Sequence, residues 1–178
     1  MNSEKLTFKA QEAFQRAASL VQQYGQPRIE SLHLLHALIS EHEGMVRPIL
    51  DQTGVNSEQM LSLTAAELAR LPRVSGGSQV AVGQEVEAIL NASTQCAESM
   101  GDEFVSTDHL LVAITQVPTK AQELLKVQGI RESDLFEVVQ KLRAGSRVTD
   151  PTPESTFDAL NKYGIDLVTR AEQGKLDP

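Results

Sequence analysis

The chain repeats one stretch of its own sequence at a distance of 76 positions. Residues 31–38 read SLHLLHAL, and residues 107–114 read TDHLLVAI. The same shift aligns the apolar positions of residues 6–24 with those of residues 82–100, and both sets recur at the three- and four-residue spacing of one helical face. From residues 49–50, which match residues 124–125, the shift between matching positions is 75. A duplication of this kind predicts two copies of one structural unit.

Each copy predicts four helices, and the fold class is therefore all-α, a duplicated four-helix repeat with about eight helices. Gly25 and Gly101 are expected to end the first helix of each copy in a left-handed cap. Ser31 and Thr107 are expected to provide the N-cap hydroxyl of the second helix. The expected helices lie near residues 7–24, 31–42, 45–53 and 57–71, then 83–100, 107–116, 119–127 and 132–143.

The domain boundaries follow from the repeats and from changes in composition. Residues 1–145 are expected to form one repeat domain, with the repeats at residues 6–72 and 80–145. Residues 146–155 contain two prolines and mostly polar side chains without an apolar period, which is typical of an interdomain linker. Residues 156–178 are too few for a domain and are interpreted as the opening of a further one.

The charge and the cysteine content exclude several classes of function. Lys and Arg total 16 against 24 for Asp and Glu, so the net charge of −8 repels nucleic acid and anionic membrane surfaces. A single cysteine cannot form an intrachain disulfide. No apolar run approaches the roughly 20 residues that span a bilayer, and the first residues lack the apolar stretch of a signal peptide. We therefore expect a cytoplasmic protein without nucleic-acid or membrane partners.

Histidine and cysteine are the residues that could have carried chemistry here. His33 and His36 lie three apart on one helical face, and a small metal-dependent hydrolase is one hypothesis for them. No further ligand at a suitable spacing completes such a site, so packing near a helix start is the expected role. Cys96 falls at the position of Leu20 in the other copy, which predicts a buried thiol rather than a nucleophile.

Catalytic and phosphate-binding motifs are missing from the sequence. Neither G-x-S-x-G nor H-E-x-x-H occurs, and the one Gly-Lys pair, Gly174-Lys175, is followed by leucine and lacks the leading glycine of a phosphate-binding loop. The chain is therefore expected to have no catalytic residues, to bind no cofactor or metal and not to be an enzyme.

The duplicated unit, with a His-Leu-Leu core after a Ser or Thr in each copy, resembles the Clp amino-terminal repeat family. Residues 68–74 (LARLPRV) and 101–106 (GDEFVS) are more similar to the ClpB branch than to the ClpA and ClpC branches. Residues 159–167 (ALNKYGIDL) and 170–178 (RAEQGKLDP) look like the entry into the first AAA+ module of that branch.

This resemblance implies a role for the chain within a larger machine. Proteins of the ClpB branch are hexameric, ATP-driven disaggregases of the stress response, which bind ATP and magnesium in their AAA+ modules and work with the DnaK chaperone system. The amino-terminal domain is implied to capture unfolded or aggregated client proteins. The isolated chain is expected to be a monomer, because the hexamer contacts of the family come from AAA+ modules.

The resemblance also implies where a client binds, in a groove between the two repeats. The matching positions are Thr7, Ala92, Cys96, Asp102, Asp108 and His109. Three of them, Ala92, Cys96 and His109, fall where relatives often carry leucine, so a less apolar groove and weak binding are expected. An alternative interpretation is an adaptor-docking domain that feeds a protease, as in the ClpA and ClpC branches.

Overall fold

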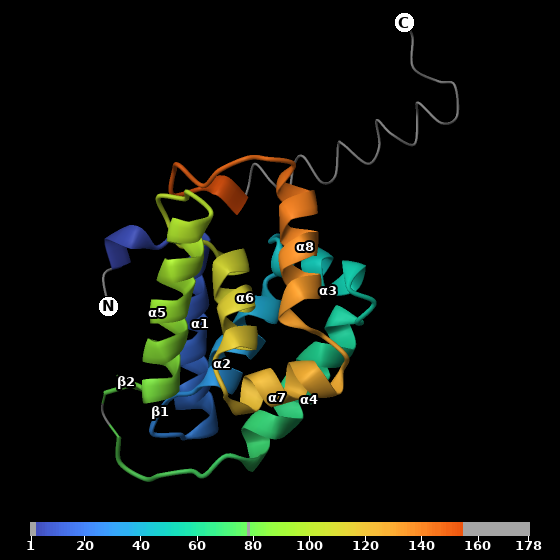
Figure 1. Ribbon diagram of the computed structural model, residues 1–178. Helices are drawn as coiled ribbons and strands as arrows, with labels where there is room; N and C mark the ends of the chain where they lie inside the picture. Colours follow the sequence, from blue (N-terminus) through green and yellow to red (C-terminus); the bar gives the residue numbers. More distant parts are fainter. Residues whose placement is uncertain (1–2, 78, 155–178) are drawn as a thin grey trace, which may run out of the picture.

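Eight α-helices in two sets of four make up the part of the chain that the computed structural model describes, residues 3–77 and 79–154 (Figure 1). The predicted all-α, duplicated fold is confirmed. The helices are α1 (Phe8–Tyr24), α2 (Ser31–Ser40), α3 (Val46–Gln52), α4 (Ser57–Arg70), α5 (Gln84–Ser99), α6 (Thr107–Gln116), α7 (Lys120–Val127) and α8 (Glu132–Arg143). A 3-10 turn (Ser3–Lys5) and two short strands, β1 (Arg28–Ile29) and β2 (Ala81–Val82), complete the elements.

Helices α2 and α6 are the centre of the molecule and are equivalent in the two repeats. Almost every side chain of each is buried, since both are apolar on nearly all faces. Helix α1 packs against α2, and α5 packs against α6. In Figure 1, α5 and α8 flank α6 at the front, and α1 and α2 lie behind. The core is therefore continuous across both repeats.

Two short parallel backbone pairings join the repeats and are related by the internal symmetry. Leu6 of the first repeat pairs with Val105 of the second, and Val82 of the second pairs with Ile29 of the first. Leu6 corresponds to Val82, and Ile29 to Val105, at the shift of 76. Each repeat thus supplies its entry segment to the other, so the two copies pack as pseudo-twofold mates. Strands of two residues carry no alternating pattern, so the sequence did not predict them.

The helix ends confirm the predicted left-handed glycines and correct three of the predicted cap positions. Gly25 is the C-cap of α1 with φ of 64°, whereas Gly101, with φ of 72°, follows Met100, the C-cap of α5. The prediction that Ser31 and Thr107 are N-caps is wrong, because they are the first residues inside α2 and α6. The N-caps are the residues before them, Glu30 and Ser106.

The segment after α8 lies against the domain as far as it is described. Val148 is fully buried, and residues 146–154 run across the end of α5 and α8 at the top of Figure 1. The last residue of the expected linker, residue 155, and the expected opening of an AAA+ module, residues 156–178, lie outside the described residues. Within the described ranges, no helix is both long enough and apolar enough to cross a membrane.

Candidate binding site between the repeats

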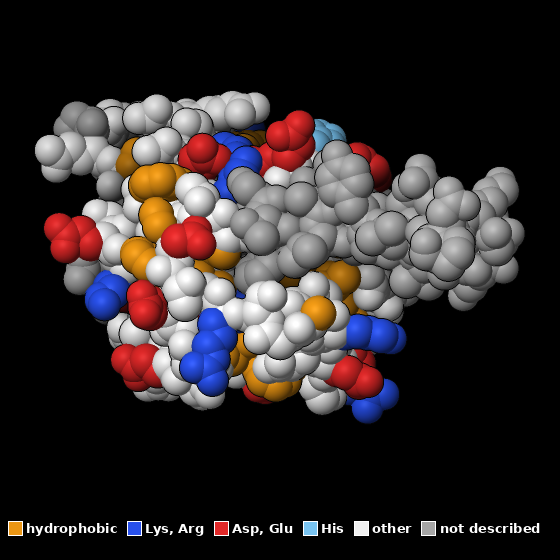
Figure 2. Space-filling view, turned by 90° about the horizontal axis from the view of Figure 1, so that it is seen from above, with side chains coloured by type: hydrophobic (Ala, Val, Ile, Leu, Met, Phe, Trp, Pro, Cys, Tyr) orange, Lys and Arg blue, Asp and Glu red, His pale blue; other side chains and the backbone are white. Residues whose placement is uncertain are grey.

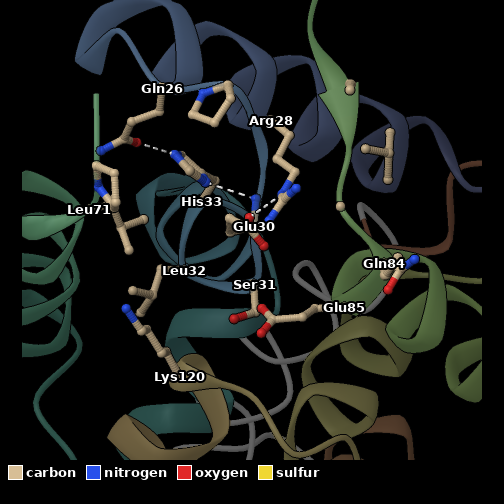
Figure 3. A pocket seen from close by; sticks show the side chains of 15 residues that line it. Gln26, Arg28, Glu30, Ser31, Leu32, His33, Leu71, Gln84, Glu85 and Lys120 are labelled. Atoms are coloured by element: carbon tan, nitrogen blue, oxygen red, sulfur yellow. Dashed lines mark hydrogen bonds and ion pairs between the residues drawn. The ribbon is translucent and has the colours of Figure 1, made fainter. Parts of the chain in front are cut away.

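A pocket of about 710 Å³ opens at the seam between the two repeats (Figure 3). The first repeat contributes the loop before α2, the start of α2 and the residues that follow α4. The second repeat contributes β2, the start of α5 and Lys120 of α7. The lining residues are Gln26, Pro27, Arg28, Glu30, Ser31, Leu32, His33, Leu71, Pro72, Ala81, Val82, Gly83, Gln84, Glu85 and Lys120. The seam is thus hollow on this side of the molecule.

The inner wall of the pocket is polar, and its hydrogen bonds are satisfied. The Nδ1 atom of His33 accepts the backbone N–H of Glu30 at 2.9 Å, and its Nε2 atom lies 2.5 Å from Oε1 of Gln26. The amide of Gln26 in turn donates to the carbonyl of Leu68 at 2.6 Å. Burial lowers the pKa of His33 to about 4, so the ring is neutral at pH 7. This wall therefore supplies a fixed, uncharged surface and not an acid or a base.

The equivalent histidines of the two repeats have the same role, which is to cap the start of a helix. His33 is the third residue of α2 and accepts the N–H of the N-cap residue Glu30, whose side chain caps the start of the helix in return. His109 does the same at the start of α6 with the N-cap residue Ser106. Both rings are buried. The described residues contain no group of three or more His, Cys, Asp and Glu side chains that could hold a metal ion.

The rim of the pocket carries charges of both signs. The Nε atom of Arg28 lies 2.5 Å from Oε1 of Glu30, and Lys120 and Glu85 project from the opposite repeat (Figure 3). Since two cations and two carboxylates line the opening, neither sign dominates. Such a rim favours neither phosphate nor a metal ion.

The internal symmetry places a second, equivalent junction between the repeats. We call the junction with the open pocket the first seam and its pseudo-twofold mate the second seam. Four of the predicted site residues lie at the second seam. Thr7, Asp102, Asp108 and His109 correspond to Gly83, Gln26, Leu32 and His33, all of which line the open pocket. The structure brings these four predicted residues together at the second seam. All four side chains are buried there.

Ion pairs fill the interior of this second copy. The Nη1 atom of Arg143 lies 2.5 Å from Oδ2 of Asp102, and its Nε atom lies 2.8 Å from Oδ2 of Asp108. His109 Nε2 lies 2.7 Å from the same Asp102 oxygen. Burial alone would raise the pKa of Asp108, but the attraction of His109 and Arg143 outweighs it and holds the pKa at about 2. The two aspartates are thus ionised and paired.

Thr7 connects this cluster to the segment after α8. Its Oγ1 atom accepts the N–H of Ala10, which caps α1, and donates to Oε1 of Glu154 at 2.6 Å. The same Glu154 oxygen accepts the N–H of Thr107 at 3.2 Å. The second seam is therefore occupied, and the first is open.

The remaining predicted site residues, Ala92 and Cys96, lie on α5 and do not line the open pocket. Ala92 is half-buried, and Cys96 is 7 % exposed, with its Sγ 3.9 Å from Sδ of Met100. Burial, with a smaller effect of the Asp108 charge, raises the pKa of the Cys96 thiol to about 11. Contact between a client and any of the six predicted residues stays a prediction.

Sequence reasoning missed Arg143 and Glu154, which the structure places at the centre of the second seam. A signal for Arg143 was present. At the shift of 75 it falls on Leu68, and Asp108 falls on Leu32 at the shift of 76. Opposite charges at two positions whose repeat mates are apolar indicate a buried ion pair. No comparable signal marks Glu154, which lies beyond the repeats.

Comparisons with known proteins agree with this geometry. A family model described as the Clp repeat (R) N-terminal domain matches residues 5–128. The chaperone protein ClpB of Rhodopirellula baltica is 41 % identical to this chain over 98 % of its length. ClpB of Bacteroides thetaiotaomicron is 38 % identical over 100 % of its length. In each case the match covers 20 % of the relative. The chain thus spans about a fifth of the length of the curated relatives it matches.

Solved structures show the same fold. The Hsp104 N-terminal domain from Candida albicans superimposes with a TM-score of 0.76 at 16 % identity, covering 85 % of this chain and 99 % of that one. A ClpV N-domain in complex with a VipB peptide gives a TM-score of 0.66 at 19 % identity, covering 82 % and 91 %. The matched region is an amino-terminal domain and not an ATPase domain. The chain therefore belongs to the Clp repeat N-terminal domain family, with ClpB chaperones among the relatives it resembles over its whole length.

Proposed function

We propose that this chain is the client-engaging amino-terminal domain of a ClpB-type, ATP-dependent protein disaggregase. Exposed apolar segments of unfolded or aggregated proteins enter the groove between the two repeats. The observation that carries this proposal is the open pocket at the seam, where residues 26–33 of one repeat face residues 81–85 of the other. An extended segment in this pocket contacts both repeats at once.

The chemistry of the pocket suits a varied polypeptide. Leu71 and Val82 offer apolar contact, and the polar wall and the mixed rim accept backbone and polar groups. The end of the domain opposite the pocket, seen in Figure 2, likewise mixes acidic, basic and hydrophobic side chains without a field of one sign. The mixed lining of the pocket supports weak and promiscuous binding, with a Kd of roughly micromolar or higher. Weak binding allows release of the client to the rest of the machine.

The solved ClpV N-domain with a VipB peptide supports a peptide-binding role for this fold, because that protein holds a peptide on a similar scaffold. The six predicted residues remain part of the proposal. Ala92 is half-buried, whereas residues 146–154 bond to Thr7 and Asp102, and Arg143 of α8 bonds to Asp108.

The whole protein is proposed to act as the resemblance implies. It forms a homohexamer through AAA+ modules that bind ATP and magnesium, and it works in the cytoplasm with the DnaK chaperone system. The domain by itself is proposed to be monomeric and to have no catalytic activity.

A titration of a labelled, permanently unfolded protein tests the proposed site. Ala81 is exposed and lines the pocket, so Ala81→Trp fills the opening and should weaken client binding at least several-fold. Asn91→Trp is the matched control, because it adds the same indole to an exposed position of α5 outside the pocket. Equal affinity in both variants would place client binding elsewhere. Binding of one folded partner, without binding of the unfolded client, would favour the adaptor-docking alternative.

A further inference from the structure

Residues 146–154, here called the clasp, hold the second seam by a small number of contacts. Only three of its nine side chains are buried, those of Val148, Pro153 and Glu154. Val148 and Glu154 anchor the clasp to the domain. The stretch between these two anchors is mainly exposed, and Thr152 is hydrogen-bonded to Asp150 within it. A segment with so few buried side chains differs from the helices of the core, each of which buries a whole face.

The first anchor is an exchange of backbone and side-chain hydrogen bonds around Val148. The N–H of Val148 donates to Oδ1 of Asp102 at 2.8 Å, and its carbonyl accepts the N–H of Glu103 at 2.8 Å. The carbonyl of Pro151 then accepts the N–H of Phe8, the first residue of α1, at 2.9 Å. The clasp thus pairs with the domain as an extended peptide does, largely through its main chain.

The second anchor is the carboxylate of Glu154, which lies where the starts of α1 and α6 converge. Its Oε1 atom accepts from Oγ1 of Thr7 and from the N–H of Thr107. Helix N-termini attract an anion through their free N–H groups and their dipoles. Its Oε2 atom, however, is buried without a hydrogen-bond partner among the described residues, and the Asp108 carboxylate lies close enough to repel it. Burying this carboxylate therefore costs free energy, which opposes docking of the clasp.

The first seam shows the same site without a clasp. Four residues that line the open pocket are the repeat mates of residues at the second seam. The pairs are Gln26 with Asp102, Ser31 with Thr107, Gly83 with Thr7 and Gln84 with Phe8. The chain after α4 leaves past Leu71 and Pro72 toward β2, whereas the chain after α8 turns back across its own seam. The domain thus contains one docking geometry twice, open in one copy and filled in the other.

We propose that the clasp is a releasable internal ligand of the second seam. Its release uncovers a second docking site for an extended segment. That segment offers a carbonyl to the start of α1 and a carboxylate to the starts of α1 and α6. The assignment of clients as the competing segments rests on the function proposed above. The site buried at Thr7, Asp102 and Thr107 is then available only while the clasp is open.

Native-state hydrogen exchange of the whole 178-residue chain tests whether the clasp releases. The N–H groups of Phe8 and Glu103 donate to the clasp, whereas those of Thr7 and Asp102 donate to Val105 and Ala97 and serve as neighbouring controls. We expect Phe8 and Glu103 to exchange at least tenfold faster than the two control amides, with little dependence on urea. Exchange of all four at one rate, through unfolding of the whole domain, would overturn the clasp.

The variant Glu154→Ala links release to binding. It removes the carboxylate but keeps the carbonyls that Phe8 and Glu103 contact, so faster exchange at these two amides reports release. Thr149→Ala, at an exposed position of the clasp, is the matched control and should change nothing. We expect Glu154→Ala to bind the labelled unfolded protein several-fold more tightly. Faster exchange without tighter binding would overturn the second docking site, and Ala81→Trp reports separately on the function proposed for the first seam.

Discussion

Arg143 lies in α8 at the position that Leu68 holds in α4, and both side chains are fully or almost fully buried. At Leu68 the structure places the uncharged amide of Gln26, which donates to its carbonyl. Around Arg143 it places two carboxylates, those of Asp102 and Asp108. The same packing position is therefore uncharged in the first repeat and ionic in the second.

The first prediction uses the first repeat as a template for the second. Arg143→Leu should cost about 3–5 kcal/mol of unfolding free energy, because it leaves two buried carboxylates without their partner. The triple variant Asp102→Gln, Asp108→Leu and Arg143→Leu copies the residues of the first repeat and should recover most of this loss, since apolar replacement of a whole buried ion cluster is often neutral or better. Urea unfolding measures both. A triple variant no more stable than Arg143→Leu would contradict the equivalence of the two clusters.

A second prediction concerns pH. The folded-state pKa of His33 is about 4, below its ordinary value of 6.5, so the unfolded chain binds a proton between these two values and the folded chain does not. The stability that neutral His33 contributes is present above pH 6.5 and is lost as the pH falls toward 4, by about 1.4 kcal/mol per pH unit.

Urea unfolding of the wild type and of His33→Gln between pH 7.5 and pH 4 measures this contribution as the difference in slope. His42→Gln is the control, because His42 is exposed. The His33 variant should lose less stability on acidification than the wild type, and the control should follow the wild type. Parallel curves for wild type and His33→Gln would show that burial does not disfavour the protonated ring.

The helices could be predicted from the sequence because their information is local. Apolar residues at three- and four-residue spacing, with Gly25 and Gly101 after the first helix of each copy, placed all eight helices to within two residues of the observed ends. The N-caps were misassigned by one residue, because the histidine that completes each capping box lies inside the helix and has no distinctive pattern of its own.

The candidate site could be predicted only in part, because its contacts are distant in sequence. Arg143 lies 41 residues from Asp102 and 35 from Asp108, and Glu154 lies 147 residues from Thr7. Composition after α8 indicates a linker, and two isolated anchors such as Val148 and Glu154 do not change that composition. The residues of the second seam were named, therefore, but neither their burial nor the segment that covers them followed from the sequence.

A third prediction is that the thiol of Cys96 reacts slowly in the folded protein. With a pKa of about 11, its thiolate fraction at pH 8 is over 100-fold lower than that of a free cysteine, and the side chain is almost buried. A disulfide reagent at pH 8 should label it at least about 100-fold more slowly in buffer than in concentrated urea. Comparable rates in both solvents would mean that this face of α5 is open to solvent.

The fourth prediction tests the equivalence of the two central helices. Leu35 of α2 and Leu111 of α6 are repeat mates, and both are completely buried. Replacing either by alanine should cost about 2–5 kcal/mol, from the lost apolar contact and the cavity that remains. Because the two helices occupy equivalent places in one continuous core, the two losses should be similar and each should lower the urea midpoint of the whole domain in a single transition. Val127→Ala, at a position that is 79 % exposed, should change stability by less than about 0.5 kcal/mol. Two separate transitions in either leucine variant would show that the repeats unfold independently, which their exchanged entry segments at Leu6 and Val82 oppose.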